Sequence, residues 1–136
     1  MADIFISYAE SDRAVAEQIG GIIPGFGYTT WYYDRDFVPG VSHLETTKRQ
    51  IEAASIVVVI VSRASLNSDF VFPEMLHAVA THKHLIPVLI DIDYQDLERE
   101  KPRWVTAPGF SVAVTWGDGD EALLALLRGI VALIGE

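Results

Sequence analysis

Short apolar runs alternate with longer amphipathic stretches along this chain. We expect strands where the apolar runs lie, at 4–7, 28–33, 56–61, 85–90 and 110–115. The run at 56–61 contains six aliphatic residues in a row, which is typical of a strand buried on both faces of a parallel sheet. The run at 28–33 is rich in aromatic and β-branched residues, which also favours a strand.

Capping signals and apolar spacing predict the helices. The first is expected to begin at a Ser11-Asp12 cap and to be closed by Gly20-Gly21 and Pro24-Gly25. Ser42 opens a capping-box pattern, in which its hydroxyl caps an amide three residues later. The later helices are expected at 42–54, 73–82 and 120–134, the last one capped by Asp120, and loops are expected at 34–41, 62–69 and 91–108, the last loop with one irregular helical turn.

The alternation of strands and helices predicts the fold. Short connections between strand and helix favour a parallel sheet with helices on both faces and right-handed crossovers. We therefore expect one flavodoxin-like α/β domain over 1–136, a three-layer sandwich with strand order 2-1-3-4-5. In that architecture ligands bind beyond the carboxyl ends of the strands, so function should reside in the loops after Ser7, Tyr33 and Val61.

Composition and charge exclude several classes of function. The chain of 136 residues carries 19 Asp and Glu against 10 Lys and Arg, a net charge of −9, which argues against nucleic-acid or anionic-membrane binding. It has no cysteine, so disulfides, iron–sulfur clusters and a cysteine nucleophile are excluded. No signal peptide or apolar stretch of the roughly 20 residues of a membrane span is present, and we expect a cytoplasmic domain.

The predicted functional loops lack the motifs of the common cofactor sites. The first turn after a strand, 7–11, has no glycine, so a Rossmann dinucleotide site is not expected, and no P-loop lysine motif occurs. Ser7-Tyr8 and Ser62 stand where a phospho-receiver domain needs acidic residues. The histidines are not spaced as a helical metal pair and are expected on solvated helix surfaces: His43, His77, His82 and His84. We expect neither a metal nor a cofactor.

Glu74 is the acidic residue that stands out. It follows Pro73, and proline is favoured at the first position of a helix. A carboxylate in the first helical turn is stabilised by unpaired amides and by the helix dipole. From the residues alone, two alternatives explain Glu74: it is a helix-stabilising side chain, or it is a catalytic residue.

Taken together, four segments resemble a Toll/interleukin-1 receptor (TIR) domain of the bacterial kind over essentially the whole chain. Residues 3–8 are similar to the family's D-x-F-I-S-Y box, and 31–40 to its W-x-D-x-x-x-x-PG loop. Residues 62–66 resemble the segment after the third strand. Phe70 and Glu74 match the family's W-x-x-x-E motif, with phenylalanine in place of tryptophan.

This resemblance implies one of two functions. Some TIR domains cleave NAD+ at the nicotinamide–ribose bond with a glutamate that matches Glu74. The chain is expected to be such an NAD+ nucleosidase, of the glycohydrolase or ADP-ribosyl cyclase type, with NAD+ as substrate. Others are non-catalytic modules that bind further TIR domains, which is the alternative here. A virulence factor that mimics host TIR domains is a third, less favoured reading.

Further roles follow from the same resemblance. Phe5 is equally explained as a core residue, Arg35 as a solvated charge and Ser42 as a helix cap. The residues expected to contact substrate are Phe5, Tyr8, Asp34, Arg35, Ser42, Ser62 and Phe70.

The resemblance also implies self-association and a role in antiviral defence. TIR–TIR contacts are expected to involve the apolar loop tip formed by Phe37, Val38, Pro39 and Gly40, because such a tip is unfavourable in water. We expect an effector domain beside a fused or separate sensor domain.

Overall fold

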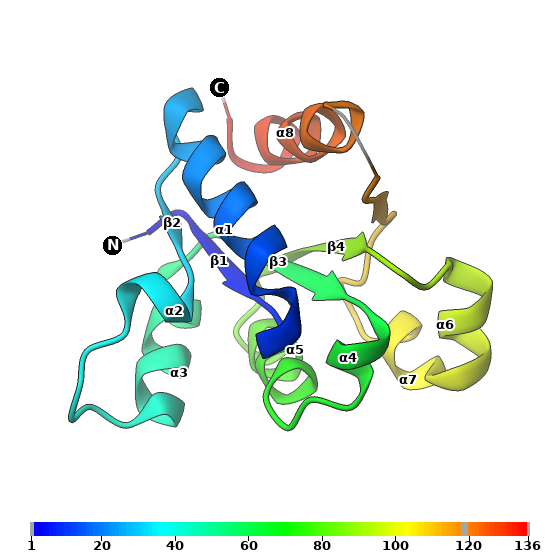
Figure 1. Cartoon of the computed structure of the whole chain (residues 1–136), viewed down its shortest axis with the longest axis horizontal. Helices are drawn as coiled ribbons and strands as arrows, with labels where there is room; N and C mark the ends of the chain where they lie inside the picture. The colour runs from blue at the N-terminus through cyan, green and yellow to red at the C-terminus, as the bar shows by residue number, and fades with distance from the viewer. Residues whose placement is uncertain (1, 118–119, 136) are drawn as a thin grey trace.

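The computed structural model describes residues 2–117 and 120–135, and it contains a five-stranded, all-parallel sheet of order β2-β1-β3-β4-β5 (Figure 1). This confirms the predicted fold class and strand order; residues 1 and 136 of the predicted domain lie outside the described residues. The strands are β1 (Ile4–Ser7), β2 (Thr30–Trp31), β3 (Ile56–Val61), β4 (His84–Leu89) and β5 (Val114–Thr115). Every residue of the central β3 is buried, as its aliphatic run predicts.

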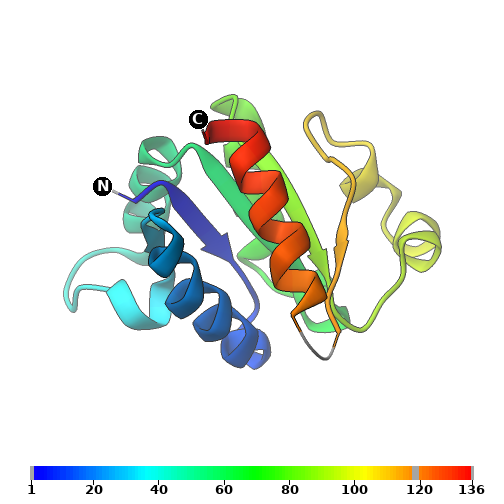
Figure 2. The same cartoon turned by 90° about the horizontal axis from the view of Figure 1, so that it is seen from above.

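Helices cover both faces of this sheet. One face packs against α1 and α8, which lie over it in Figure 2, and the other packs against α3 and α5. The α-helices are α1 (Arg13–Ile22), α2 (Tyr33–Asp36), α3 (His43–Ala53), α4 (Arg63–Leu66), α5 (Val71–Ala80), α6 (Tyr94–Glu100), α7 (Pro102–Val105) and α8 (Glu121–Ile134), and two short 3-10 helices are η1 (Glu10–Asp12) and η2 (Ile23–Phe26). Among the described residues, none of these helices is long and apolar enough to span a membrane.

Both edge strands are shorter than predicted. The strand expected at 28–33 pairs only at Thr30–Trp31, because the Tyr32 amide donates to the Asp36 carboxylate at 3.0 Å and the chain turns into α2. The strand expected at 110–115 pairs only at Val114–Thr115. Before it, the Ser111 hydroxyl donates to the Leu85 carbonyl at 2.7 Å, so a side chain takes the place of ladder pairing.

Three segments predicted as loops contain helical turns. Segment 34–41 begins within α2. Segment 62–69 contains α4, which begins with reciprocal hydrogen bonds between Ser62 and Ser65. Segment 91–108 contains α6, capped by Asp93, and α7, which has Pro102 in its first turn.

Of the residues predicted to close α1, Gly20 and Gly21 lie inside it, whereas Pro24-Gly25 lie just after its end, in η2. Gly20 is a packing residue, since a β-carbon there would lie 2.4 Å from the Tyr32 ring. The chain reverses later, at Gly27, whose φ of 95° is in the left-handed region that favours glycine. Asp12 and Asp120 occupy the predicted cap positions, but neither side chain bonds to its helix.

Candidate functional site

A pocket of about 320 Å³ lies at the carboxyl end of β1. Its walls come from β1 and the loop after it, from α2, and from the first turns of α3 and α5. This is the edge of the sheet at which the predicted topology places ligands. The residues that line the pocket are Phe5, Ile6, Tyr8, Glu10, Tyr33, Asp34, His43, Phe70 and Glu74.

Helix α5 carries Glu74 into this pocket. The helix begins at Val71, two residues before the predicted start, so Pro73 is its third residue. The first four amides of a helix have no partner within it, so a proline there removes no helical hydrogen bond. The Glu74 amide donates to the Phe70 carbonyl at 3.0 Å, and the side chain lies in the first turn as expected.

Ser7 holds the Glu74 carboxylate in place. The Ser7 hydroxyl, at the end of β1, donates to Glu74 Oε1 at 2.7 Å. Ser7 is 1% exposed and the Glu74 side chain is 12% exposed, so water reaches this pair poorly. A hydrogen bond to a carboxylate is stronger than a neutral one, and it orients the carboxylate toward the pocket.

His43 is a pocket residue that sequence reasoning missed. It is the first residue of α3, and its Nε2 lies 3.8 Å from Glu74 Oε2. Its ring centre is 4.2 Å from that of Tyr33 and 4.4 Å from that of Phe70. The prediction that the histidines lie on solvated helix surfaces is therefore wrong for His43. The signal for this place is that His43 follows the Ser42 cap of the helix beside the predicted binding loops. His77 lies on α5, whereas His82 and His84 are exposed but lie in the turn after α5 and at the start of β4.

Tyr8 and Asp34 line the pocket and bind each other. The Tyr8 hydroxyl donates to Asp34 Oδ2, and the Asp34 amide donates to the Tyr8 oxygen at 3.0 Å. Burial, together with the hydrogen bond to Asp34, raises the pKa of Tyr8 well above its ordinary value, so the phenol stays protonated as a donor. This pair ties α2 to the loop after β1.

Phe5 and Phe70 also line the pocket, at different depths. Phe5 is 1% exposed and stacks on Trp31 with ring centres 5.2 Å apart, so it belongs to the core as well as to the pocket floor. Phe70 is 53% exposed and lies over the His43 ring at the mouth.

The remaining three residues predicted to bind substrate do not line the pocket. The Arg35 guanidinium donates to the backbone carbonyls of Thr30 and Gly20 and lies over the Tyr32 ring. Ser42 accepts from the Glu45 amide at 3.4 Å, so it is a helix cap. Ser62 is 1% exposed and donates its hydroxyl to Asp12. These side chains are committed to other partners.

The loop between α2 and α3 exposes apolar side chains, as its sequence predicts. Phe37 is 46% exposed and Val38 is 57% exposed. Tyr33 stacks on Phe37 with ring centres 5.5 Å apart, and Gly40 has a φ of 88° that favours glycine. The pocket and this loop are therefore linked through the Tyr33 ring.

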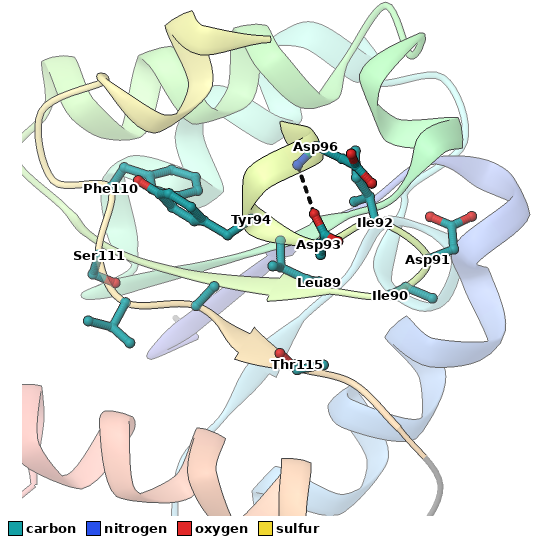
Figure 3. A pocket seen from close by; sticks show the side chains of 12 residues that line it. Leu89, Ile90, Asp91, Ile92, Asp93, Tyr94, Asp96, Phe110, Ser111 and Thr115 are labelled. Carbon is teal, nitrogen blue, oxygen red and sulfur yellow. Dashed lines mark hydrogen bonds between the residues drawn. The ribbon is translucent and has the colours of Figure 1, made fainter. Parts of the chain in front are cut away.

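A larger hollow of about 1040 Å³ lies elsewhere, between the ends of β4 and β5 and α6 (Figure 3). Its acidic side chains are already used within the fold. Asp93 accepts from the Asp96 amide at 2.7 Å, Asp91 accepts from the Arg63 amide at 2.8 Å, and Asp96 pairs with Arg99. The smaller pocket is the candidate site because it contains Glu74.

Comparison with known proteins identifies similar chains. A family model described as a TIR domain matches residues 4–126. The stimulator of interferon genes protein of Magallana gigas is 35% identical over 92 residues, which are 63% of this chain and 22% of that protein.

Solved structures share the fold. A metazoan TIR-STING receptor from C. gigas in complex with 2′,3′-cGAMP is 26% identical with a TM-score of 0.74, covering 96% of this chain and 39% of that one. The TIR domain of the Toll-related receptor TRR-2 from Hydra magnipapillata has 20% identity and a TM-score of 0.72, covering 96% and 98%. The TIR domains of the activated Roq1 resistosome have 18% identity and a TM-score of 0.75, covering 96% and 99%. The chain thus spans well under half of the STING relatives and nearly the whole of the other two.

Proposed function

The chain belongs to the TIR domain family, and we propose that it is an NAD+ nucleosidase that cleaves the bond between nicotinamide and ribose. The observation that carries this proposal is the Glu74 carboxylate, which Ser7 holds at 2.7 Å beside a pocket of about 320 Å³. A charged group with so little exposure is costly to keep unless it has a partner or a function. Its only hydrogen bond among the described residues is to Ser7, through one oxygen, so the other oxygen is available to a ligand.

The reaction needs a fixed negative charge more than it needs a proton donor. When the N-glycosidic bond breaks, its electron pair leaves with the pyridinium nitrogen, and nicotinamide departs neutral. The ribose C1′ is left as an oxocarbenium ion, which water attacks, releasing one proton to solvent. The carboxylate of Glu74 stabilises a positive charge that develops in the transition state, as in glycoside hydrolysis.

The walls of the pocket suit one end of the substrate. Aromatic rings of Phe5, Tyr33 and Phe70 offer apolar surface to a planar nicotinamide. The volume is at the lower end of the roughly 300–1,000 Å³ of typical small-molecule sites. The nicotinamide riboside end would therefore occupy the pocket, and the rest of the dinucleotide would extend outside it.

Release of free nicotinamide tests the proposal. Concentrated protein is incubated with NAD+, and nicotinamide is measured for the wild type, for Glu74→Gln and for Glu45→Gln. Glu45 is a matched control because it is an exposed glutamate in the first turn of α3. We expect release by the wild type and by Glu45→Gln and its loss in Glu74→Gln. Equal release by all three would point away from Glu74.

The biological setting proposed is an immune effector in the cytoplasm. The chain corresponds to 22% of the Magallana gigas relative and to 39% of the TIR-STING receptor, so in proteins of that kind it would accompany a sensor domain. The similar structure of the activated Roq1 resistosome contains several TIR domains. By analogy, self-association through the loop at 37–40 would activate this chain. A bacterial antiviral system is the setting that its motifs favour.

A non-catalytic TIR–TIR interaction module is the second candidate. The exposed apolar side chains of Phe37 and Val38 favour it, because they support association without any chemistry at Glu74. The two functions differ in one result: the module assembles but releases no nicotinamide in the assembled state.

A further inference from the structure

We propose that His43 and Glu74 together bind one hydroxyl group of the ligand, and that this hydroxyl belongs to the ribose next to the bond that is cleaved. The inference rests on the proposed function for the identity of the ligand. It assigns to His43 a role in binding and selecting the substrate.

The first observation is an unpartnered polar atom. His43 Nε2 is buried and has no hydrogen-bond partner among the described residues. It lies 3.8 Å from Glu74 Oε2, which is beyond the usual length of a hydrogen bond. A buried polar atom without a partner is unfavourable, so a ligand that satisfies it gains affinity.

The second observation is how firmly both groups are held. The His43 ring lies between Tyr33 and Phe70, with ring centres 4.2 and 4.4 Å away. Glu74 Oε1 is bound by Ser7 at 2.7 Å, so Oε2 is the oxygen that faces His43. The two atoms therefore face each other across a gap of 3.8 Å, with the His43 side chain 31% exposed and the Glu74 side chain 12% exposed.

The gap selects a hydroxyl group. A third atom does not fit on the line between two atoms 3.8 Å apart, but one oxygen can lie beside that line at roughly 2.8 Å from each. With a hydrogen on Nε2, that oxygen accepts it and donates its own hydrogen to the carboxylate, and a hydroxyl can do both. A carbonyl oxygen only accepts, and an ammonium group only donates, so neither satisfies both sides. In NAD+ the hydroxyls nearest the scissile bond are those of the nicotinamide ribose.

Phe70 controls access to this gap. Nε2 itself is closed to solvent, whereas the Phe70 ring over His43 is 53% exposed. An exposed ring can turn outward without opening the core. As the ligand enters, the Phe70 ring would turn aside and lie against the nicotinamide, while Tyr33 keeps its contact with the imidazole.

Two substitutions separate hydrogen bonding from packing. His43→Phe keeps an aromatic ring between Tyr33 and Phe70 but has no nitrogen. His43→Gln loses the ring and restores an N–H donor. His84→Phe is the matched control, because His84 is exposed at the start of β4.

The test compares each variant on NAD+ and on analogues that lack the 2′- or the 3′-hydroxyl of the nicotinamide ribose. For His43→Phe we expect kcat/KM on NAD+ to fall roughly 10- to 100-fold. This is the effect expected when the ribose hydroxyl, which also binds the Glu74 carboxylate, loses its hydrogen bond to His43. We expect little further loss on the analogue without the critical hydroxyl. His43→Gln should recover part of the loss, and His84→Phe should match the wild type.

Binding of a carbocyclic NAD+ analogue, which keeps both hydroxyls and cannot be cleaved, tests the inference independently of turnover. Weaker binding by His43→Phe than by the wild type supports it even if NAD+ is not cleaved, and in that case only the enzymatic function fails. Unchanged binding and unchanged selectivity in His43→Phe would overturn it while the enzymatic function stands. If the wild type neither binds the analogue nor cleaves NAD+, both fail.

Discussion

Ser7 and Glu74 are 67 positions apart in the chain and are joined by a 2.7 Å hydrogen bond from the serine hydroxyl to the carboxylate. Ser7 ends β1 and Glu74 lies in the first turn of α5, so the bond joins the sheet to the helix that lies beneath it. It places a fixed negative charge at the edge of the sheet where ligands bind in this architecture.

Replacing Ser7 by alanine tests whether that bond positions the carboxylate. We expect Ser7→Ala to lower kcat for nicotinamide release about tenfold or more, with a smaller change in KM, because the carboxylate becomes free to turn. Ser111→Ala is the control, since it also removes a serine hydroxyl, one that donates to the Leu85 carbonyl at 2.7 Å and does not line the pocket. Equal kinetic effects in both variants would show that only stability is involved.

The two glycines inside α1 are expected to respond in opposite ways. A β-carbon on Gly20 would lie 2.4 Å from the Tyr32 ring, so Gly20→Ala should lower the free energy of unfolding by roughly 1–3 kcal/mol. At Gly21 nothing lies within 4 Å, so Gly21→Ala should raise it by about 0.5–1 kcal/mol. Urea unfolding of both variants measures this, and a destabilised Gly21→Ala would contradict the packing described.

Asp12 makes the stability of the domain depend on pH. Burial raises its pKa, the hydrogen bond from Ser62 opposes this, and the nearby charge of Asp91 raises it further. A folded-state pKa above the unfolded one means that Asp12 favours folding below its unfolded pKa, and that this contribution is lost as pH rises through the folded pKa.

Asp12→Asn should therefore have a higher Tm than the wild type at pH 7 and a smaller advantage at pH 3. The asparagine oxygen still accepts from Ser62, so the comparison isolates the charge. Thermal melts of both proteins at the two pH values check it, and a lower Tm of the variant at pH 7 would refute it.

The exposed loop tip is expected to mediate self-association. The double variant Phe37→Ser, Val38→Ser should stay monomeric in sedimentation at concentrations where the wild type assembles, and its nicotinamide release per molecule should no longer rise with concentration. Phe26→Ser is the matched control, because Phe26 is 59% exposed on η2. If both sets of variants assemble as the wild type does, the loop is not the interface.

Much of the fold follows from local patterns. Six consecutive aliphatic residues define β3 at its observed bounds, and the alternation of strands and helices gives the strand order. The bounds of the edge strands were less predictable. Aromatic residues such as Tyr32 favour strands in general, but here the Tyr32 amide bonds to Asp36 and the chain turns into α2. Segment 91–108 was expected to contain one irregular helical turn and contains two helices, α6 and α7. They were hard to predict because each is short and depends on a single cap or proline.

The candidate site was predictable in its place and only partly in its residues. The carboxyl end of β1 and the first turn of α5 can be located from the topology, and Glu74 lies there. Arg35 and Ser62 lie outside the pocket because their partners, the Thr30 carbonyl and Asp12, come from other elements. His43 was missed because its environment forms only when α2, α3 and α5 meet.

The central claim is that the charge of Glu74 acts on the transition state, and the behaviour of Glu74→Gln tests it most directly. The amide keeps the shape of the side chain and loses its charge. The account predicts that Glu74→Gln binds the carbocyclic NAD+ analogue about tenfold more weakly than the wild type, because one hydrogen bond to the ribose hydroxyl is lost, while its rate of nicotinamide release falls by a further factor of about 10² to 10³. An unchanged rate, with the variant folded as the wild type, would contradict it.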